Sequence, residues 1–185
     1  MNIVVKTADE KYIVRPDTTW EKDAEDLYVP EFVNQISYTP VLFVRISKPG
    51  RSVSAKFASR YYDAVGYGVL LYPEDMLDGS ETGFACASCL DHTSFLTAPF
   101  FSPDTLGKEY HLKAGDKEIF SHAEGTAEMV EKAIEEATRF IYIRTGDLLA
   151  IELQPRKQLI SRGEESIELC SSFAENELAS FKIIF

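Results

Sequence analysis

The segment from Asn34 to Ile46 constrains the fold most, because apolar side chains alternate along it with a period of two. One face would carry Tyr38, Leu42, Val44 and Ile46, and the other Thr39, Val41 and Phe43. This alternation predicts a β-strand. Proline has no N–H for a strand ladder, so Pro40 predicts a sheet edge or a bulge at that point.

The rest of the chain also favours strands, separated by turns and by longer polar loops. We expect a loop between Arg15 and Glu25, a turn at Lys48-Pro49-Gly50, a long irregular segment over residues 78–108 and a hairpin around Lys113–Lys117. The β-branched and aromatic runs predict further strands at Ile3–Val5, Tyr12–Val14, Gly66–Tyr72, Leu148–Leu153, Ile167–Leu169 and Phe181–Phe185.

One helix is clear from the pattern, at about residues 126–140. Thr126 is its expected N-cap, and its apolar stripe consists of Met129, Val130, Ala133, Ile134, Ala137 and Ile141. A second helix is expected from Val53 to Tyr62, with Ser52 or Ser54 as its N-cap. The fold class is therefore α+β and mainly β.

Composition narrows the class of protein. The 185 residues predict one domain, 1–185, and the 45% hydrophobic share is that of a folded protein. The longest apolar run, Val65–Tyr72, is too short to cross a membrane, and the charged start argues against a signal peptide. Three cysteines do not indicate a disulfide scaffold, so we expect a soluble, cytoplasmic protein. A net charge of −11 argues against nucleic acid as a partner.

Three stretches together resemble the fumarylacetoacetate hydrolase family. They are Tyr38–Val53, Phe57–Val69 and Thr145–Leu149, in the family's order, and Arg15-Pro16-Asp17 is similar to a short segment that precedes them. The resemblance extends over about residues 15–153. It implies a mixed β-roll, a homodimer, Mg²⁺ or Mn²⁺ as cofactor, and hydrolysis, isomerisation or decarboxylation of small dicarbonyl acids.

The family's chemistry does not carry over residue by residue. Where the resemblance implies a Glu-x-Glu pair of metal ligands, this chain has Thr39 and Val41, and Leu70 stands where it implies an aspartate. Ser88 stands where it implies a catalytic lysine. We call these four the vestigial positions. Valine and leucine offer no oxygen to a hard cation such as Mg²⁺, so we expect no metal and no cofactor at them.

Further family features are lost and a few are kept. The family's Gly-Thr-Pro stretch is replaced by Ile151-Glu152-Leu153-Gln154, and no histidine precedes His92 to form the family's Glu-His dyad. Asp75, Asp91 and Gly146-Asp147 are retained. We interpret the chain as a pseudoenzyme that has lost metal-dependent catalysis and binds a small acid or partners a catalytic relative.

Two alternatives remain open. The chain could be an active hydrolase, isomerase or decarboxylase in which Glu74, Asp75, Asp91 or His92 transfers protons. It could also be an interaction module in which Cys86, Cys89 and His92 hold zinc, although a structural zinc site needs four ligands and a fourth is not evident.

Overall fold

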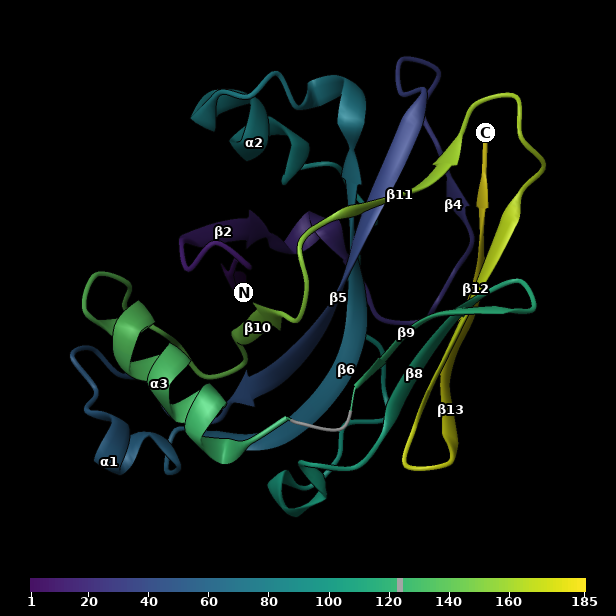
Figure 1. Ribbon diagram of the computed structural model, residues 1–185. Helices are drawn as coiled ribbons and strands as arrows, with labels where there is room; N and C mark the ends of the chain where they lie inside the picture. Colours follow the sequence, from purple (N-terminus) through teal and green to yellow (C-terminus); the bar gives the residue numbers. More distant parts are fainter. Residues whose placement is uncertain (123–124) are drawn as a thin grey trace.

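The computed structural model describes residues 1–122 and 125–185, and within them two mixed β-sheets pack together with three α-helices (Figure 1). The larger sheet has the strand order β2-β1-β10-β5-β6-β7-β3, with β11 also paired to β5. Its strands are β1 (Asn2–Lys6), β2 (Tyr12–Pro16), β3 (Trp20–Glu21), β5 (Gln35–Ile46), β6 (Tyr62–Pro73), β7 (Ser94–Phe95), β10 (Leu148–Glu152) and β11 (Lys157–Ser161).

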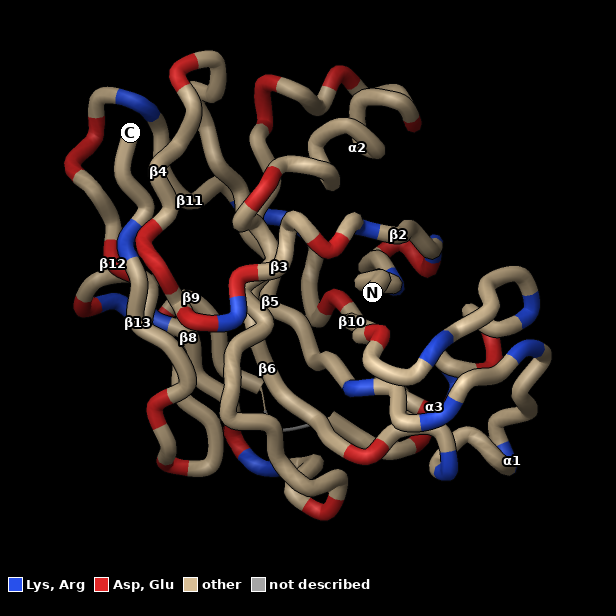
Figure 2. The backbone as a smooth tube through the Cα atoms, turned by 180° about the vertical axis from the view of Figure 1, so that it is seen from behind, with Lys and Arg blue, Asp and Glu red and all other residues tan. Residues whose placement is uncertain are grey.

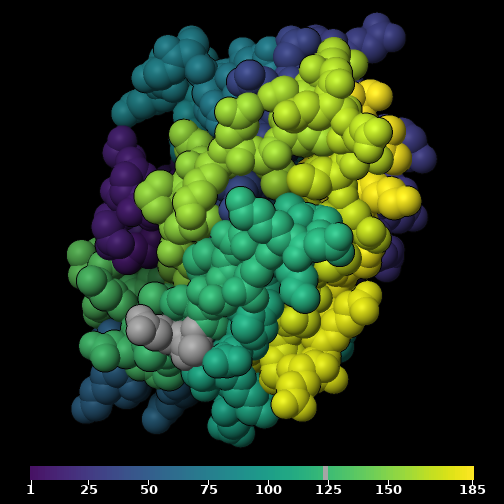
Figure 3. Space-filling view, turned by 45° about the vertical axis from the view of Figure 1, so that its right-hand side comes forward, coloured from purple at the N-terminus to yellow at the C-terminus, as the bar shows by residue number. Residues whose placement is uncertain are grey.

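The smaller sheet lies against one face of the larger one and has the order β4-β13-β12-β8-β9. Its strands are β4 (Leu27–Tyr28), β8 (Tyr110–Ala114), β9 (Lys117–His122), β12 (Ile167–Phe173) and β13 (Asn176–Ile184). Figure 3 shows the β8–β9 hairpin side by side with the C-terminal strands. The α+β, mainly β class is confirmed, as are the expected strands.

The β5–β6 hairpin is the centre of the larger sheet, with register from Ile36–Pro73 to Ile46–Tyr62. The two-faced alternation predicted for β5 is confirmed, because Leu42 and Val44 belong to one core and Val41 and Phe43 to another. Gly68 of β6 lies so close to β7 that a Cβ atom there would be 2.2 Å from the carbonyl oxygen of Phe95.

Pro40 does not mark an edge strand, which corrects the expectation from sequence. β5 is paired with β6 on one side and with β10 and then β11 on the other. β10 pairs with Val41–Arg45 and β11 with Gln35–Tyr38, so Pro40 lies where the neighbouring strand changes. The Pro40 carbonyl on that side accepts a hydrogen bond from Leu153 N–H. The missing N–H of proline therefore falls at a local gap in the ladder.

The first core fills the space between the two sheets and helix α3 (Ala127–Thr138). The Thr126 side chain accepts a hydrogen bond from Met129 N–H, so the predicted N-cap is confirmed. The buried stripe of α3 faces this core, which includes Val130, Ala133, Ile134 and Ala137. Among the described residues, no helix is long and apolar enough to cross a membrane.

The second core covers the other face of the larger sheet. It combines side chains of four strands, namely Ile3, Val5, Val41, Phe43, Leu70, Tyr72, Leu148 and Ala150, with Ala87 and Leu96. This face carries three of the vestigial positions, Thr39, Val41 and Leu70, and faces helix α2 (Glu81–Ala87).

In three segments the secondary structure differs from the one that the sequence predicts. The helix expected at Val53–Tyr62 is the single turn α1 (Ala55–Ala58), because the N–H groups of Arg60 and Tyr61 bond three residues back and the chain then enters β6. Ser54 is at its N-cap position, but the Ser54 side chain makes no capping hydrogen bond. The irregular segment 78–108 contains α2 and β7. The expected loop before Glu25 contains a 3₁₀ turn at Asp17–Thr19 and β3.

Candidate functional site

The register of β5 and β6 brings three of the vestigial positions together. Thr39 is directly opposite Leu70, and Val41 lies two residues further along the same face of β5. All three side chains are fully buried. The strand pairing therefore places them as neighbours on one face, which is the arrangement that ligands of a single ion would need.

Their chemistry does not fit a divalent cation. Val41 and Leu70 pack in the second core, and neither has an oxygen or nitrogen in its side chain. The Thr39 hydroxyl donates a 2.7 Å hydrogen bond to the Gln154 carbonyl. Mg²⁺ and Mn²⁺ prefer several oxygen ligands. In the part of the chain that the structure describes, no three His, Cys, Asp or Glu side chains form a group that could hold a metal.

Ser88, the fourth vestigial position, ends α2 and has a structural role. Its hydroxyl donates to the Phe84 carbonyl at 2.8 Å, and its own carbonyl accepts from the Arg15 Nε at 3.0 Å. The residue is buried, so its hydroxyl is turned into the helix end and not toward solvent.

Arg15 is a fully buried cation that joins distant parts of the second core. Its guanidinium donates to the carbonyls of Leu71, Ser88 and Thr93 and to the hydroxyls of Thr93 and Ser94. It also lies 4.7 Å from the centre of the Tyr72 ring. Burial lowers the pKa of Arg15 from its ordinary value. Carbonyl dipoles and an aromatic face replace water around this charge.

Glu152 is a buried carboxyl at the end of β10 and is held on both oxygens. Tyr72 Oη donates to Oε1 at 2.8 Å, and the backbone N–H of Ala8 donates to Oε2 at 2.9 Å. Burial raises the pKa of Glu152, although these two donors and the charges of Arg156 and Arg15 oppose the shift. Burial likewise raises the pKa of Tyr72. The Tyr72 phenol is therefore neutral, and the Glu152 carboxyl is the group of this pair that titrates.

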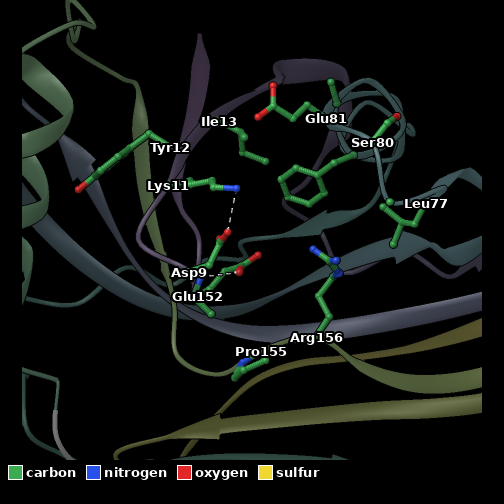
Figure 4. A pocket seen from close by; sticks show the side chains of 14 residues that line it. Asp9, Lys11, Tyr12, Ile13, Leu77, Ser80, Glu81, Glu152, Pro155 and Arg156 are labelled. Carbon is green, nitrogen blue, oxygen red and sulfur yellow. Dashed lines mark hydrogen bonds and ion pairs between the residues drawn. The ribbon is translucent and has the colours of Figure 1, made fainter.

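A cleft of about 610 Å³ opens beside Glu152. The turn after β1, the start of β2, helix α2 and the segment after β10 form its walls, and these segments meet at one edge of the molecule (Figures 3 and 4). The lining residues are Ala8, Asp9, Lys11, Tyr12, Ile13, Leu77, Gly79, Ser80, Glu81, Phe84, Ala85, Glu152, Pro155 and Arg156.

Arg156 provides the free cation of this cleft. Its guanidinium lies 5.1 Å from the ring centre of Tyr72 and 4.9 Å from that of Phe84, and these two rings stack on each other. Arg156 forms no ion pair with any residue of 1–122 or 125–185. Lys11, the other cation of the lining, is engaged with Asp9 at 3.3 Å (Figure 4).

The structure does not bring the predicted proton-transfer residues together. Asp75 accepts hydrogen bonds from the side chain of Asn34 and from the backbone N–H groups of Asn34 and Gln35, which lowers the pKa of its carboxyl. His92 pairs with Glu21 at 2.9 Å. The cleft beside Glu152 is not lined by any of the four predicted residues, Glu74, Asp75, Asp91 and His92.

Asp91 lines a second, more open hollow of about 490 Å³ together with Cys86 and Cys89. Both cysteines are exposed free thiols. His92, the third residue of the expected zinc cluster, is not part of that lining and is held by Glu21. Within the described residues the three do not form a metal-binding group.

Two of the residues that form the site were missed by sequence reasoning. The sequence pattern marks Arg15 only as part of a family-like segment at the start of an expected loop, and it does not single out Arg156. Glu152 had been noted as part of a replaced family stretch, without a role. The sequence did contain a signal for Glu152, because Leu148, Ala150 and Glu152 share one face of a predicted strand and the third of them is a carboxylate.

No protein-family model matches the sequence, and no curated protein matches it. Solved structures do match across the whole chain. A protein from Yersinia pestis assigned to the fumarylacetoacetate hydrolase family has a TM-score of 0.81 at 16% identity, covering 99% of this chain and 92% of its own. Fumarylpyruvate hydrolase from Pseudomonas aeruginosa, solved with Mn²⁺ and pyruvate, has a TM-score of 0.79 at 13% identity, covering 100% and 90%.

A third match is 5-carboxymethyl-2-hydroxymuconate delta-isomerase from Mycobacterium smegmatis, with a TM-score of 0.77 at 12% identity, covering 99% of this chain and 78% of its own. The fold is thus the mixed β-roll that these hydrolases and isomerases share. The chain has the fold of the fumarylacetoacetate hydrolase family, and the resemblance stated from its motifs is confirmed at the level of the fold.

Proposed function

We propose that this protein binds a small organic acid in the cleft beside Glu152 and Arg156, without the divalent cation used in metal-dependent chemistry. The observation that carries the proposal is the content of the vestigial positions. Val41 and Leu70 are packed in an apolar core, and the Thr39 hydroxyl is engaged with a backbone carbonyl. An octahedral oxygen site has no ligands to start from there.

The cleft supports an acid as the ligand because of the charge and shape of its lining. The Arg156 guanidinium acts on Glu152 through its charge but forms no ion pair with a carboxylate of the described residues, and its planar fork suits a carboxylate. Phe84, Leu77 and Ile13 give the same cleft an apolar wall. A compact anion with a short carbon body therefore fits it best.

The alternative is an active hydrolase, isomerase or decarboxylase with relocated catalytic groups. The structure favours a different residue for this role from those that the sequence suggested. Asp75 and His92 are engaged elsewhere. Glu152 is instead the carboxyl that reaches the cleft, and its pKa is raised.

We further propose a homodimer or a pairing with a catalytic relative as the assembled form. Surface charge argues against the α1 end as a two-fold interface. Exposed cations gather there, as Figure 2 shows, and acidic residues are absent between Glu31 and Asp63. A two-fold axis would bring these cations face to face. They include Lys48, Arg51, Lys56 and Arg60.

Ligand-observed NMR with pyruvate and oxaloacetate, in buffer containing EDTA, tests the proposal. We expect binding in EDTA, loss of binding in Arg156→Ala, and unchanged binding in the control Arg51→Ala, which removes an exposed cation outside the cleft. Binding that requires added Mg²⁺ or Mn²⁺ would overturn the proposal, and so would the absence of binding of either acid.

A further inference from the structure

We propose that Glu152 is the base of a metal-independent proton transfer in the cleft, removing a proton from the carbon next to the carbonyl group of a bound 2-oxo acid. The inference rests on the proposed function, since the acid must first bind beside Arg156. It goes beyond that function by assigning a reaction and a base to the cleft.

The geometry around Glu152 is that of a fixed base. A hydroxyl donor and a backbone N–H hold its two oxygens at 2.8 and 2.9 Å. The residue is 8% exposed and that exposure faces the cleft, of which it is a lining residue. A carboxylate held on both oxygens and open on one side has one direction in which to accept a proton.

The charges that face Glu152 keep its carboxylate form accessible. Arg156 and Arg15 lower its pKa, and burial raises it to a greater extent, while the Tyr72 hydroxyl and Ala8 N–H favour the anion. The other charged residues of the cleft are Asp9, Lys11 and Glu81. The net effect is a carboxyl that is more basic than an exposed glutamate.

Arg156 supplies the complementary charge for the reaction. A 2-oxo acid presents a carboxylate oxygen and a carbonyl oxygen side by side, and a guanidinium fork can donate to both. Phe84 and Tyr72 support the guanidinium from below, at 4.9 and 5.1 Å from their ring centres. The cation is therefore held near the Glu152 side of the cleft (Figure 4).

The step balances with these groups and the ligand alone. The Glu152 carboxylate takes the proton from carbon, the electron pair of the broken C–H bond forms a carbon–carbon double bond, and the carbonyl oxygen becomes an enolate facing Arg156. The protonated Glu152 returns a proton to the same carbon and restores the carboxylate. In D₂O the exchange of this proton with solvent replaces hydrogen by deuterium on the ligand. No oxidant, reductant or metal takes part.

Tyr72 is a positioning residue in this scheme. Its hydroxyl bonds to Glu152 and is fully buried, so it does not meet the ligand. Removing the hydroxyl in Tyr72→Phe takes a donor from the carboxylate form and shifts the pKa of Glu152 further up. The pH dependence of exchange should therefore move to higher pH in this variant, while pyruvate binding is kept.

The test follows the methyl signal of pyruvate by ¹H NMR in D₂O with EDTA present, against the same buffer without protein. We expect the wild-type protein to accelerate loss of the signal, with a rate that rises with pH and then levels as Glu152 ionises. Glu152→Gln, which keeps the size of the side chain, should lower the protein-dependent rate by at least about 100-fold. Glu177→Gln is the matched control, since it removes an exposed carboxylate outside the cleft, and should leave the rate unchanged.

The outcomes separate this inference from the proposed function. Pyruvate that binds but exchanges at the protein-free rate would overturn the role of Glu152 and leave the proposed function standing. Exchange that persists in Glu152→Gln, or that stops in EDTA, would also overturn it. Failure of pyruvate and oxaloacetate to bind at all would overturn the proposed function and the inference together.

Discussion

The hydroxyl of Tyr72 donates a 2.8 Å hydrogen bond to Glu152 across the middle strand of the larger sheet. Tyr72 on β6 is opposite Ser37, and Glu152 on β10 is opposite Val41, with β5 between them. The bond therefore crosses the face of β5 near Thr39. A hydrogen-bonded pair of polar side chains therefore spans the face of the sheet that carries Thr39, Val41 and Leu70.

The ionisation of Glu152 should make stability depend on pH. The folded-state pKa of this acid is raised, so between the unfolded value near 4.5 and the folded value the folded state binds more protons. The free energy of unfolding of the wild type should then fall, relative to that of Glu152→Gln, as pH rises from about 4.5 through the folded pKa. Urea unfolding of both proteins across that range measures the difference, and a wild type that gains stability against the variant would contradict the assignment.

The buried guanidinium of Arg15 should be important for stability. Arg15→Met removes the donors to three backbone carbonyls and two hydroxyls in an interior site. Each buried acceptor left without a partner costs about 1–3 kcal/mol, so a total loss of about 3 kcal/mol or more is expected in urea unfolding. Arg45→Ala is the control, because its partner Asp63 is half exposed and such pairs contribute about 1 kcal/mol or less. Equal losses in the two variants would contradict this role.

The close approach of β6 and β7 predicts that Gly68 cannot be replaced freely. A Cβ atom in Gly68→Ala would meet the Phe95 carbonyl oxygen at 2.2 Å, so β7 would have to move. We expect a loss of about 2 kcal/mol, in the range of overpacked cores. Gly115→Ala has open space but a φ of +56°, and should lose about 1 kcal/mol. Thermal unfolding compares the two, and an unchanged melting temperature in Gly68→Ala would refute the packing argument.

Sequence alone predicted the parts of the fold in which local pattern and tertiary packing agree. The alternation from Tyr38 to Ile46 and the stripe of the helix after Thr126 each face the core that their period indicates. Helix α2 was missed because Thr82 and Gly83 are poor helix formers. It is held instead by the Ser80 N-cap and by the packing of Phe84 on Tyr72.

The candidate site was less accessible to sequence reasoning, since contacts distant in the chain define it. Arg15 bonds to groups 56 to 79 residues away, and no local pattern distinguishes it from a surface arginine before a proline. Asp75 and His92 were singled out because of their residue types, but their partners are Asn34 and Glu21. Glu152 could have been predicted from the sequence, because a carboxylate on the buried face of a strand requires a partner.

Oligomeric state is a separate prediction. We expect static light scattering to give twice the 20.8 kDa of the chain at micromolar concentration. Reversal of a cation at the α1 end, in Arg51→Glu, should leave that mass unchanged, because this surface would repel itself. A mass of one chain would contradict the homodimer, and a dimer lost in Arg51→Glu would contradict the exclusion of the α1 end.

The absence of a divalent-cation site at Thr39, Val41 and Leu70 is the central claim, and Mn²⁺ binding tests it most directly. Electron paramagnetic resonance reports free hydrated Mn²⁺, so a titration of the protein with Mn²⁺, alone and with pyruvate, counts the ions that are bound. We predict that the signal grows as in protein-free buffer, with pyruvate absent or present. Loss of one equivalent of signal per chain, at micromolar Mn²⁺, would show that the chain holds a cation and would contradict the account.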